Sequence, residues 1–246
     1  MIPVRRGFTP AVNPMAAGFR SGALLAGFAL VIAFTSSAQA QAAPPRLELT
    51  GAILLTGGVD FGTRKATLTG NDPGNPDFTL FSTITTLGSG VGPEARLGIA
   101  LSRRLSVEGA FSWIRQTLAT RITGDAENAP DTMATQPLAT MSIGGDAVVR
   151  LTSHGFAGGK GIPFALAGGG YFSQTDDHQL QVASGGYFEA GGGVKYVLSQ
   201  RASGLLRQLA LRGDGRIVLR SNAFQPDSSG SSHATWAVTA GMSVGF

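Results

Sequence analysis

The chain has 246 residues, a formal net charge of +4, 36 glycines, no cysteine and only 14% charged residues. The missing cysteines exclude disulfides and thiol chemistry, and the glycine content argues against long helices, because glycine weakens a helix interior. Soluble domains of this size usually carry more charge, and apolar residues recur too regularly for a disordered chain.

Residues 1–40 have the order of a secretory signal peptide. Arg5 and Arg6 stand near the start, an apolar run covers 23–34, and Ala38 and Ala40 form a small-x-small cleavage site. The run is short for a transmembrane anchor of about 20 residues. The arginine pair also hints at a twin-arginine signal, which serves cargo that folds before export. We therefore expect a cleavable signal peptide over 1–40.

Residues 41–246 are expected to form one domain. Residues 1–40 hold three arginines and no acid, so the remainder carries 16 basic and 15 acidic residues, a net charge of +1. The high isoelectric point of the whole chain then partly reflects the signal peptide. Charge therefore gives no support to a nucleic-acid-binding function.

Eight segments of this domain alternate apolar and polar residues, as strands with one apolar face do. They cover 47–60, 91–101, 105–113, 140–151, 162–172, 188–198, 209–219 and 235–246. Each is long enough for the roughly 9–11 residues with which a tilted strand crosses a bilayer, and helical spacing fits them badly. The expected apolar face of 162–172 consists of Ile162, Phe164, Leu166 and Phe172.

The connections alternate between long and short. Residues 60–84 and 122–136 are long, polar and rich in turn-forming residues, as expected of outer loops, whereas 102–104 and 199–204 are short, as expected of periplasmic turns. Residues 153–161 are long for a turn and 174–181 short for an outer loop.

The charges on the polar faces of these strands decide which side meets lipid. Six acids and five bases lie there: Glu48, Glu94, Arg96, Glu108, Asp146, Arg150, Glu189, Lys195, Arg212, Asp214 and Arg216. Eight strands enclose an interior just wide enough for side chains, so the large apolar groups fit better outside, against lipid, with a near-neutral set of ions inside. In lipid every backbone group must be paired, so the sheet must close. We expect an all-β fold: an eight-stranded antiparallel up-and-down transmembrane β-barrel; a soluble barrel is the alternative.

Two further patterns fit a membrane barrel. The aromatic residues Phe111, Trp113, Phe172, Tyr196 and Trp236 lie near strand ends and are expected in interfacial girdles. The glycine triplets 168–170 and 191–193 lie within strands, where glycine permits bending and close approach of neighbours. No helix follows either triplet, so neither is expected to cradle phosphate.

The end of the chain resembles known outer-membrane barrels. Met242, Val244 and Phe246 match the C-terminal assembly signal of these proteins, which ends in an aromatic residue preceded by alternating apolar ones. The stretch 211–216 with Arg220, and the stretch 191–198, resemble strands of the OmpA-like transmembrane barrel family. The resemblance implies insertion by the barrel-assembly machinery, with Phe246 as part of the recognised signal. The family often appends a peptidoglycan-binding domain, which we expect this chain to lack.

Catalytic and metal-binding residues are not expected. His154, His178 and His233 share no short motif, and Asp176-Asp177-His178 is most simply a solvated loop tip. Ser221-Asn222-Ala223 resembles the Ser-Asn segment of lipid A deacylases, but Leu219 occupies the position of that family's catalytic histidine. Without a base the serine hydroxyl is a poor nucleophile. We expect no catalytic residue, no cofactor and no metal site.

Three functions remain open. The first is a structural or surface-interaction role with a salt-bridged interior, since buried charges must be paired; residues 60–84 are then the leading surface for external partners. The second is a narrow porin-like channel lined by Glu94, Arg96, Arg212 and Arg216. The third, least favoured, is a lipid-A-modifying enzyme. In each case we expect a monomer in the outer membrane of a Gram-negative bacterium, in contact with lipids and lipopolysaccharide and with no nucleic-acid partner.

Overall fold

The computed structural model describes residues 45–68, 78–127, 129–176, 180–201, 204–221 and 233–246. The expected signal peptide, with Ala38 and Ala40, lies outside these residues. The strands are β1 (Leu47–Thr56), β2 (Val59–Leu68), β3 (Phe78–Leu87), β4 (Gly90–Ala100), β5 (Leu105–Thr123), β6 (Thr132–Arg150), β7 (Gly161–Asp176), β8 (Gln181–Gln200), β9 (Gln208–Arg220) and β10 (His233–Gly245), with one 3₁₀ turn, η1 (Thr152–His154). No helix in the described part of the chain is long and apolar enough to span a membrane.

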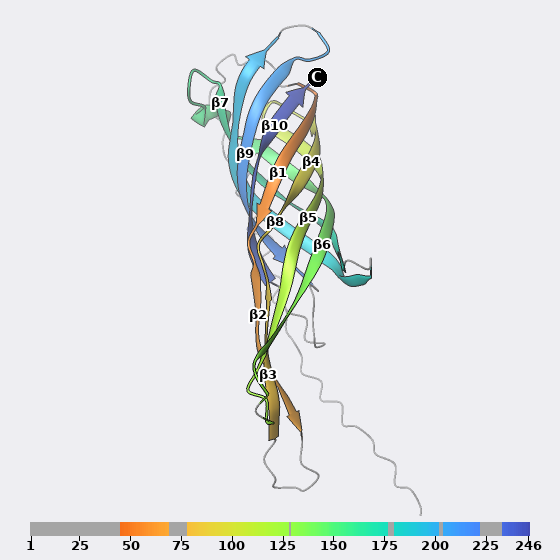
Figure 1. Cartoon of the computed structure of the whole chain (residues 1–246). Coiled ribbons are helices and arrows are strands. Elements are labelled where there is room, and N and C mark those ends of the chain that lie inside the picture. Colours follow the sequence, from red (N-terminus) through yellow and green to blue (C-terminus); the bar gives the residue numbers. More distant parts are fainter. Residues whose placement is uncertain (1–44, 69–77, 128, 177–179, 202–203, 222–232) are drawn as a thin grey trace, which may run out of the picture. The chain divides into compact units, whose positions relative to one another are not determined.

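Eight of the described strands close into a ring (Figure 1). Its order is β1-β4-β5-β6-β7-β8-β9-β10, every neighbouring pair is antiparallel, and β10 pairs back with β1 from Glu48↔Gly245 to Thr56↔Ala237. The predicted eight-stranded antiparallel barrel is confirmed. Because the ring closes, no strand within it presents an unpaired edge.

The first hairpin is longer than the sequence pattern suggested. Residues 60–84, expected to be a polar loop, belong largely to β2 and β3, and that prediction is wrong. Strand β2 follows β1 after Gly57 and Gly58, and β3 pairs with the last part of β5, from Leu87↔Leu118 to Ser82↔Thr123. The threonines of β3 were counted as polar loop residues, although threonine favours strands. The segment was therefore predicted to be a loop.

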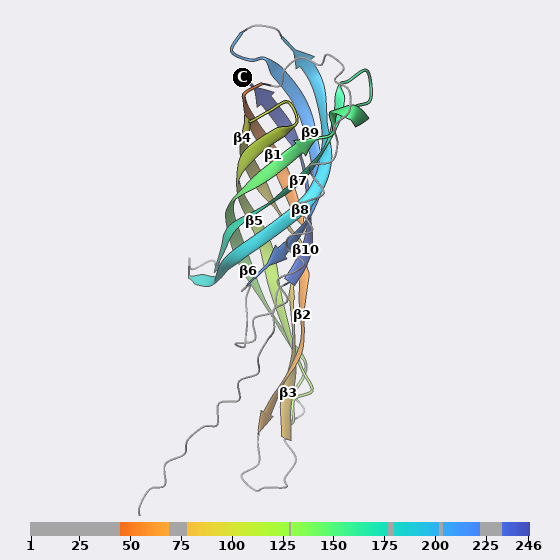
Figure 2. The same cartoon turned by 180° about the vertical axis from the view of Figure 1, so that it is seen from behind.

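The connection between β5 and β6 is also shorter than the predicted loop 122–136. Strand β5 runs to Thr123 and β6 begins at Thr132, so only 124–131 lie between them. Strands β2, β3 and the ends of β5 and β6 thus form an extension of the barrel wall, drawn at the lower end in Figures 1 and 2. We call it the hairpin extension.

Apolar side chains point outward and polar side chains inward on most strands of the ring. Leu47, Leu49 and Ile53 on β1 are 40–56% exposed, whereas Glu48 and Thr50 between them are buried. Phe111, Trp113, Tyr196 and Trp236, expected in girdles, all lie on the outer face with 36–53% of their surface exposed. The outer face therefore carries the apolar side chains that the alternation predicted.

Strand β7 is the exception. Phe164, Leu166 and Phe172 are at most 6% exposed and point into the interior, so the predicted outward face of this strand, and the girdle position of Phe172, are wrong. Alternation shows which residues share a face but not which face points inward. Most other strands carry charged residues that mark the inner side, whereas β7 has no charged residue before Asp176.

The end of the barrel where β1 begins and β10 ends is called the terminal rim. It consists of Arg46, the tight turn 101–104, the link 151–160 with η1, and the link that contains 204–207. In the tight turn, the backbone N–H groups of Arg104 and Leu105 donate to Ser102 Oγ at 3.3 and 3.0 Å. The serine side chain thus fixes the turn that the sequence predicted over 102–104.

Candidate functional site: the closed interior of the barrel

The eleven ionic residues predicted for the interior come from β1, β4, β5, β6, β8 and β9. All point inward, because a period of two places every second residue of a strand on the same side. Ten are buried, and the side chain of Arg150 is 10% exposed. The structure brings them into two groups, one around Arg96 and Arg216 and one around Glu48.

Arg96 on β4 forms the middle of the larger group. Its Nε donates to Glu94 Oε1 at 2.6 Å and its Nη1 to Asp146 Oδ2 at 2.7 Å, on β6. Nη1 also lies 3.4 Å from Glu108 on β5, and Nη2 lies 3.7 Å from Glu189 on β8. One guanidinium thus contacts carboxylates from four strands.

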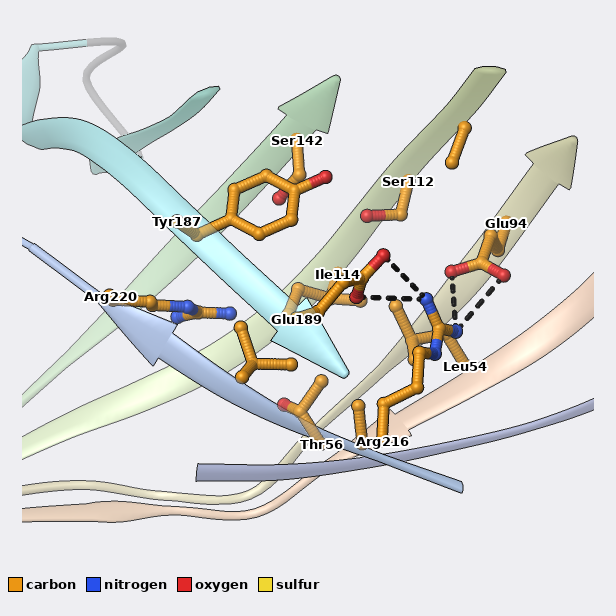
Figure 3. A pocket seen from close by; sticks show the side chains of 13 residues that line it. Leu54, Thr56, Glu94, Ser112, Ile114, Ser142, Tyr187, Glu189, Arg216 and Arg220 are labelled. Atoms are coloured by element: carbon orange, nitrogen blue, oxygen red, sulfur yellow. Dashed lines mark hydrogen bonds and ion pairs between the residues drawn. The ribbon is translucent and has the colours of Figure 1, made fainter. Parts of the chain in front are cut away.

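Arg216 on β9 reaches across the interior from the opposite wall. Its Nη2 donates to Glu94 Oε2 at 2.9 Å and its Nη1 to Glu189 Oε2 at 3.1 Å (Figure 3). Its Nε lies 2.9 Å from Asp214 Oδ1 on the same strand. Glu94, Arg96, Glu108, Asp146, Glu189, Asp214 and Arg216 are together called the central cluster.

A second group lies closer to the terminal rim. Lys195 Nζ donates to Glu48 Oε2 at 2.6 Å, which joins β8 to β1, and Arg150 Nη2 lies 3.8 Å from the same oxygen. Arg212 Nη1 donates to Glu108 Oε1 at 2.8 Å and thereby connects β9 with the central cluster. Its guanidinium also lies 4.6 Å from the ring of Phe164, which explains why that ring points inward.

Arg220 is a charged interior residue that the predicted set omitted. It is 7% exposed and lies 5.4 Å from the ring of Phe172. Its place on β9, four residues after Arg216 in a strand with period two, could have revealed it. With Arg220, the described interior holds six carboxylates and six cationic groups.

Two apolar clusters inside the barrel were also not predicted. The inner apolar seal joins Leu54, Ile114, Val218 and Ala237, from four strands, with Tyr187 packed against it. The outer apolar seal joins Leu87, Leu118 and Leu138, with Val59, Phe61 and Val182 packed against it. Neither cluster was predicted, because we assigned all apolar residues to the lipid side. Ile114 and Leu118 lie an even number of residues after the buried Glu108, so their side chains point to the same side of β5.

Polar residues between the two seals form a hydrogen-bonded chain across the wall. Gln174 Nε2 donates to Thr140 Oγ1 at 3.1 Å, Thr140 Oγ1 donates to Gln116 Oε1 at 3.4 Å, and Gln116 Nε2 donates to the Gly88 carbonyl at 3.0 Å. The chain links the neighbouring strands β7, β6 and β5 to the turn between β3 and β4. Polar side chains therefore line this side of the interior between the two seals.

A small cavity separates the central cluster from the inner apolar seal (Figure 3). Glu189, Arg216, Tyr187, Arg220, Ser112 and Ser142 contribute to its lining. Its volume of about 30 Å³ is enough for roughly one or two water molecules. We expect water to occupy it, because charged and hydroxyl groups contribute to its lining.

The described residues among those weighed for catalysis make local contacts. Ser221 Oγ donates to the Gly186 carbonyl at 3.0 Å, His233 lies edge-on to Phe61 at 5.0 Å, and His154 Nδ1 lies 3.1 Å from Ser153 Oγ. Asn222, Ala223, Asp177 and His178 lie outside the described residues. Among those described, no three His, Asp or Glu side chains come together as metal ligands.

The residues of the expected assembly signal end the last strand. Met242 is exposed on the outer face, whereas Val244 and Phe246 are partly buried. The Phe246 amide donates to the Leu47 carbonyl at 2.8 Å, so the final residue is tied to the first strand of the ring.

No protein-family model and no curated protein sequence matches this chain. Several solved structures resemble it. The outer membrane protein OprG from Pseudomonas aeruginosa aligns with a TM-score of 0.50 and 9% identity over 83% of this chain and 96% of that one. Neisserial surface protein A aligns with a TM-score of 0.45 and 12% identity, over 81% of this chain and 97% of that one. The outer membrane protease OmpT from Escherichia coli aligns with a TM-score of 0.35 and 9% identity, over 86% of this chain and 100% of that one. The likeness to OprG shows the fold: the chain has the closed antiparallel barrel of outer-membrane proteins.

Proposed function

We propose that the mature chain is an integral outer-membrane barrel with a closed interior and a structural or surface-interaction role. The observation that carries this proposal is the bridging of the interior. Arg216 spans from β9 to β4 and β8, and the two apolar seals lie on the side of the central cluster that faces the hairpin extension. An ion or solute would have to displace paired buried charges and then pass both apolar seals.

The outer face supports residence in a bilayer. Half-exposed leucine, isoleucine, phenylalanine and tryptophan side chains surround the ring, and an apolar patch of that extent on a soluble protein is unusual. In this proposal, residues 1–40 supply the export signal. The signal for the barrel-assembly machinery consists of Met242, Val244 and Phe246. The OmpA-like family is the class of barrel to which we assign the chain. The chain acts as a monomer in contact with outer-membrane lipids and lipopolysaccharide.

The hairpin extension replaces the expected loop as the surface for external partners. Strand β2 pairs only with β3 among the described strands. Leu68, Phe78 and Met133 on the extension are more than half exposed. We propose that this wall, rather than a flexible loop, presents the protein to partners outside the cell. Catalysis has no part in this role.

Conductance in planar bilayers tests the closed interior. We expect the purified protein to give no large, steady open channel, and neutralisation of Arg212 or Arg216 to leave the baseline unchanged. A steady current in the wild-type protein that changes in Arg212→Gln would instead establish the narrow channel.

Mass spectrometry of lipid A tests the enzymatic alternative. Lipid A from overexpressing cells should show an unmodified mass spectrum, and a new lipid A species would establish the enzymatic alternative.

A further inference from the structure

The terminal rim carries an excess of basic side chains. Six basic residues stand there, and no aspartate or glutamate side chain does among the described rim residues. The bases are Arg46, Arg103, Arg104, Lys160, Arg201 and Arg207, which we call the basic collar. Five of them are exposed, and Arg104 is partly buried.

The basic collar surrounds the barrel rather than occupying one side. The carbonyl of Arg46 accepts from Ala100, at the junction of β1 and β4, and the carbonyl of Arg104 accepts from Arg150, at the junction of β5 and β6. The carbonyl of Lys160 accepts from Val197 on β8, and the carbonyl of Arg207 accepts from Arg201. Each connection at this end of the ring therefore holds at least one base.

Apolar side chains accompany the bases. Leu205 is 82% exposed, Leu206 is 53% exposed, and both lie immediately before Arg207. Leu101 and Phe156 are also exposed at this rim. Exposed leucines beside arginines are the pattern of a surface that sits at the boundary between hydrocarbon and charged headgroups.

The opposite end does not share this charge. Its described residues include four bases and five acids: Arg64, Lys65, Arg115, Arg121, Asp60, Asp125, Glu127, Asp131 and Asp176. Arg121 and Asp131 form an ion pair at 2.8 Å. The basic collar is thus a property of one end of the molecule and not of its surface in general.

We infer that the basic collar binds the phosphate groups of anionic phospholipids in the leaflet around the terminal rim. A lipid annulus contacts all sides of a barrel, which matches bases on every connection, whereas an acidic protein partner would need them on one side. Each lysine or arginine near an anionic surface strengthens its attraction. The inference rests on the proposed function, because it requires the barrel to lie in a bilayer.

Spin-labelled lipids test the inference. The mature chain is reconstituted in vesicles with equal amounts of phosphatidylcholine and phosphatidylglycerol, and electron spin resonance measures which lipid is immobilised at the protein. We expect a preference for phosphatidylglycerol on the order of fivefold at low salt, the effect of one base beside an anionic surface. The preference should fall as salt rises, because salt screens exposed charges.

Variants locate the site. The variant with Arg46, Arg103, Arg201 and Arg207 changed to glutamine should lose the preference, and the same four changed to lysine should keep it. The matched control at the opposite end, with Arg64, Lys65, Arg115 and Arg121 changed to glutamine, should also keep it. An unchanged preference in the first variant, or an equal loss in the control, would overturn the inference.

The two proposals fail in different ways. Failure of the wild-type chain to insert, judged by circular dichroism in vesicles, contradicts the proposed function itself. Insertion without any lipid preference contradicts only the inference about the basic collar.

Discussion

Arg216 shows how a single residue holds the interior together. It contacts Glu94 and Glu189 on two other strands and Asp214 on its own strand, β9. Removal of Arg216 would leave these carboxylates buried without one of their cationic partners. Breaking a buried ion pair on one side typically costs about 3–5 kcal/mol. We expect Arg216→Met to lower the free energy of unfolding by that amount, measured by urea denaturation in detergent with tryptophan fluorescence.

Arg121→Gln is the matched control for that experiment. Arg121 and Asp131 are also paired at 2.8 Å, but their side chains are 59% and 47% exposed. Exposed pairs contribute about 0–1 kcal/mol, so this variant should unfold almost like the wild type. Equal stability of the two variants would mean that the central cluster does not hold the barrel together.

At the scale of elements, the glycine triplets allow neighbouring strands to approach closely. A Cβ atom at Gly191 on β8 would collide with the Gly215 carbonyl and Arg216 Cα on β9, whereas one at Gly215 would meet nothing within 4 Å. Overpacking costs about 1–3 kcal/mol. We expect Gly191→Ala to lower the free energy of unfolding by that amount in the same denaturation experiment.

Gly215→Ala should leave the stability within about 1 kcal/mol of the wild type, on the stabilising side, because alanine restricts the unfolded chain. Both glycines lie in the β8–β9 pairing, Gly191 on the face of the buried Glu189 and Gly215 on the exposed outer face. A loss in both variants would show that the interstrand approach at Gly191 is not the cause.

The elements also show how far the sequence predicts this fold. On β9, Arg212, Asp214 and Arg216 mark the inner side, and the alternation then orients the whole strand. On β7 no ion marks a side, so its aromatic residues were assigned to lipid. The ion pairs themselves were not predictable, because strand register decides which residues face each other: Glu94 and Arg216 are 122 positions apart.

At the scale of the whole molecule, the proposed role of Phe246 in assembly can be separated from a role in packing. The bond from the Phe246 amide to the Leu47 carbonyl uses the backbone and survives any side-chain change except proline. We therefore expect Phe246→Ala to reduce the folded fraction recovered from cell membranes while leaving the stability of the refolded barrel unchanged. Phe246→Trp, which keeps an aromatic ring, should restore recovery. An equal loss of stability in vitro would assign Phe246 a packing role instead.

The long reach of the interior ion pairs has a consequence for folding. Lys195 and Glu48 are separated by 147 positions, and Arg212 and Glu108 by 104. A partly formed sheet that has not yet rolled up would leave these ions without their partners, so half-built intermediates gain little from them. Closure of the ring supplies all of these contacts at once. The interior ion pairs therefore favour an all-or-none folding transition, in which pairing of the last two strands stabilises every strand already in place.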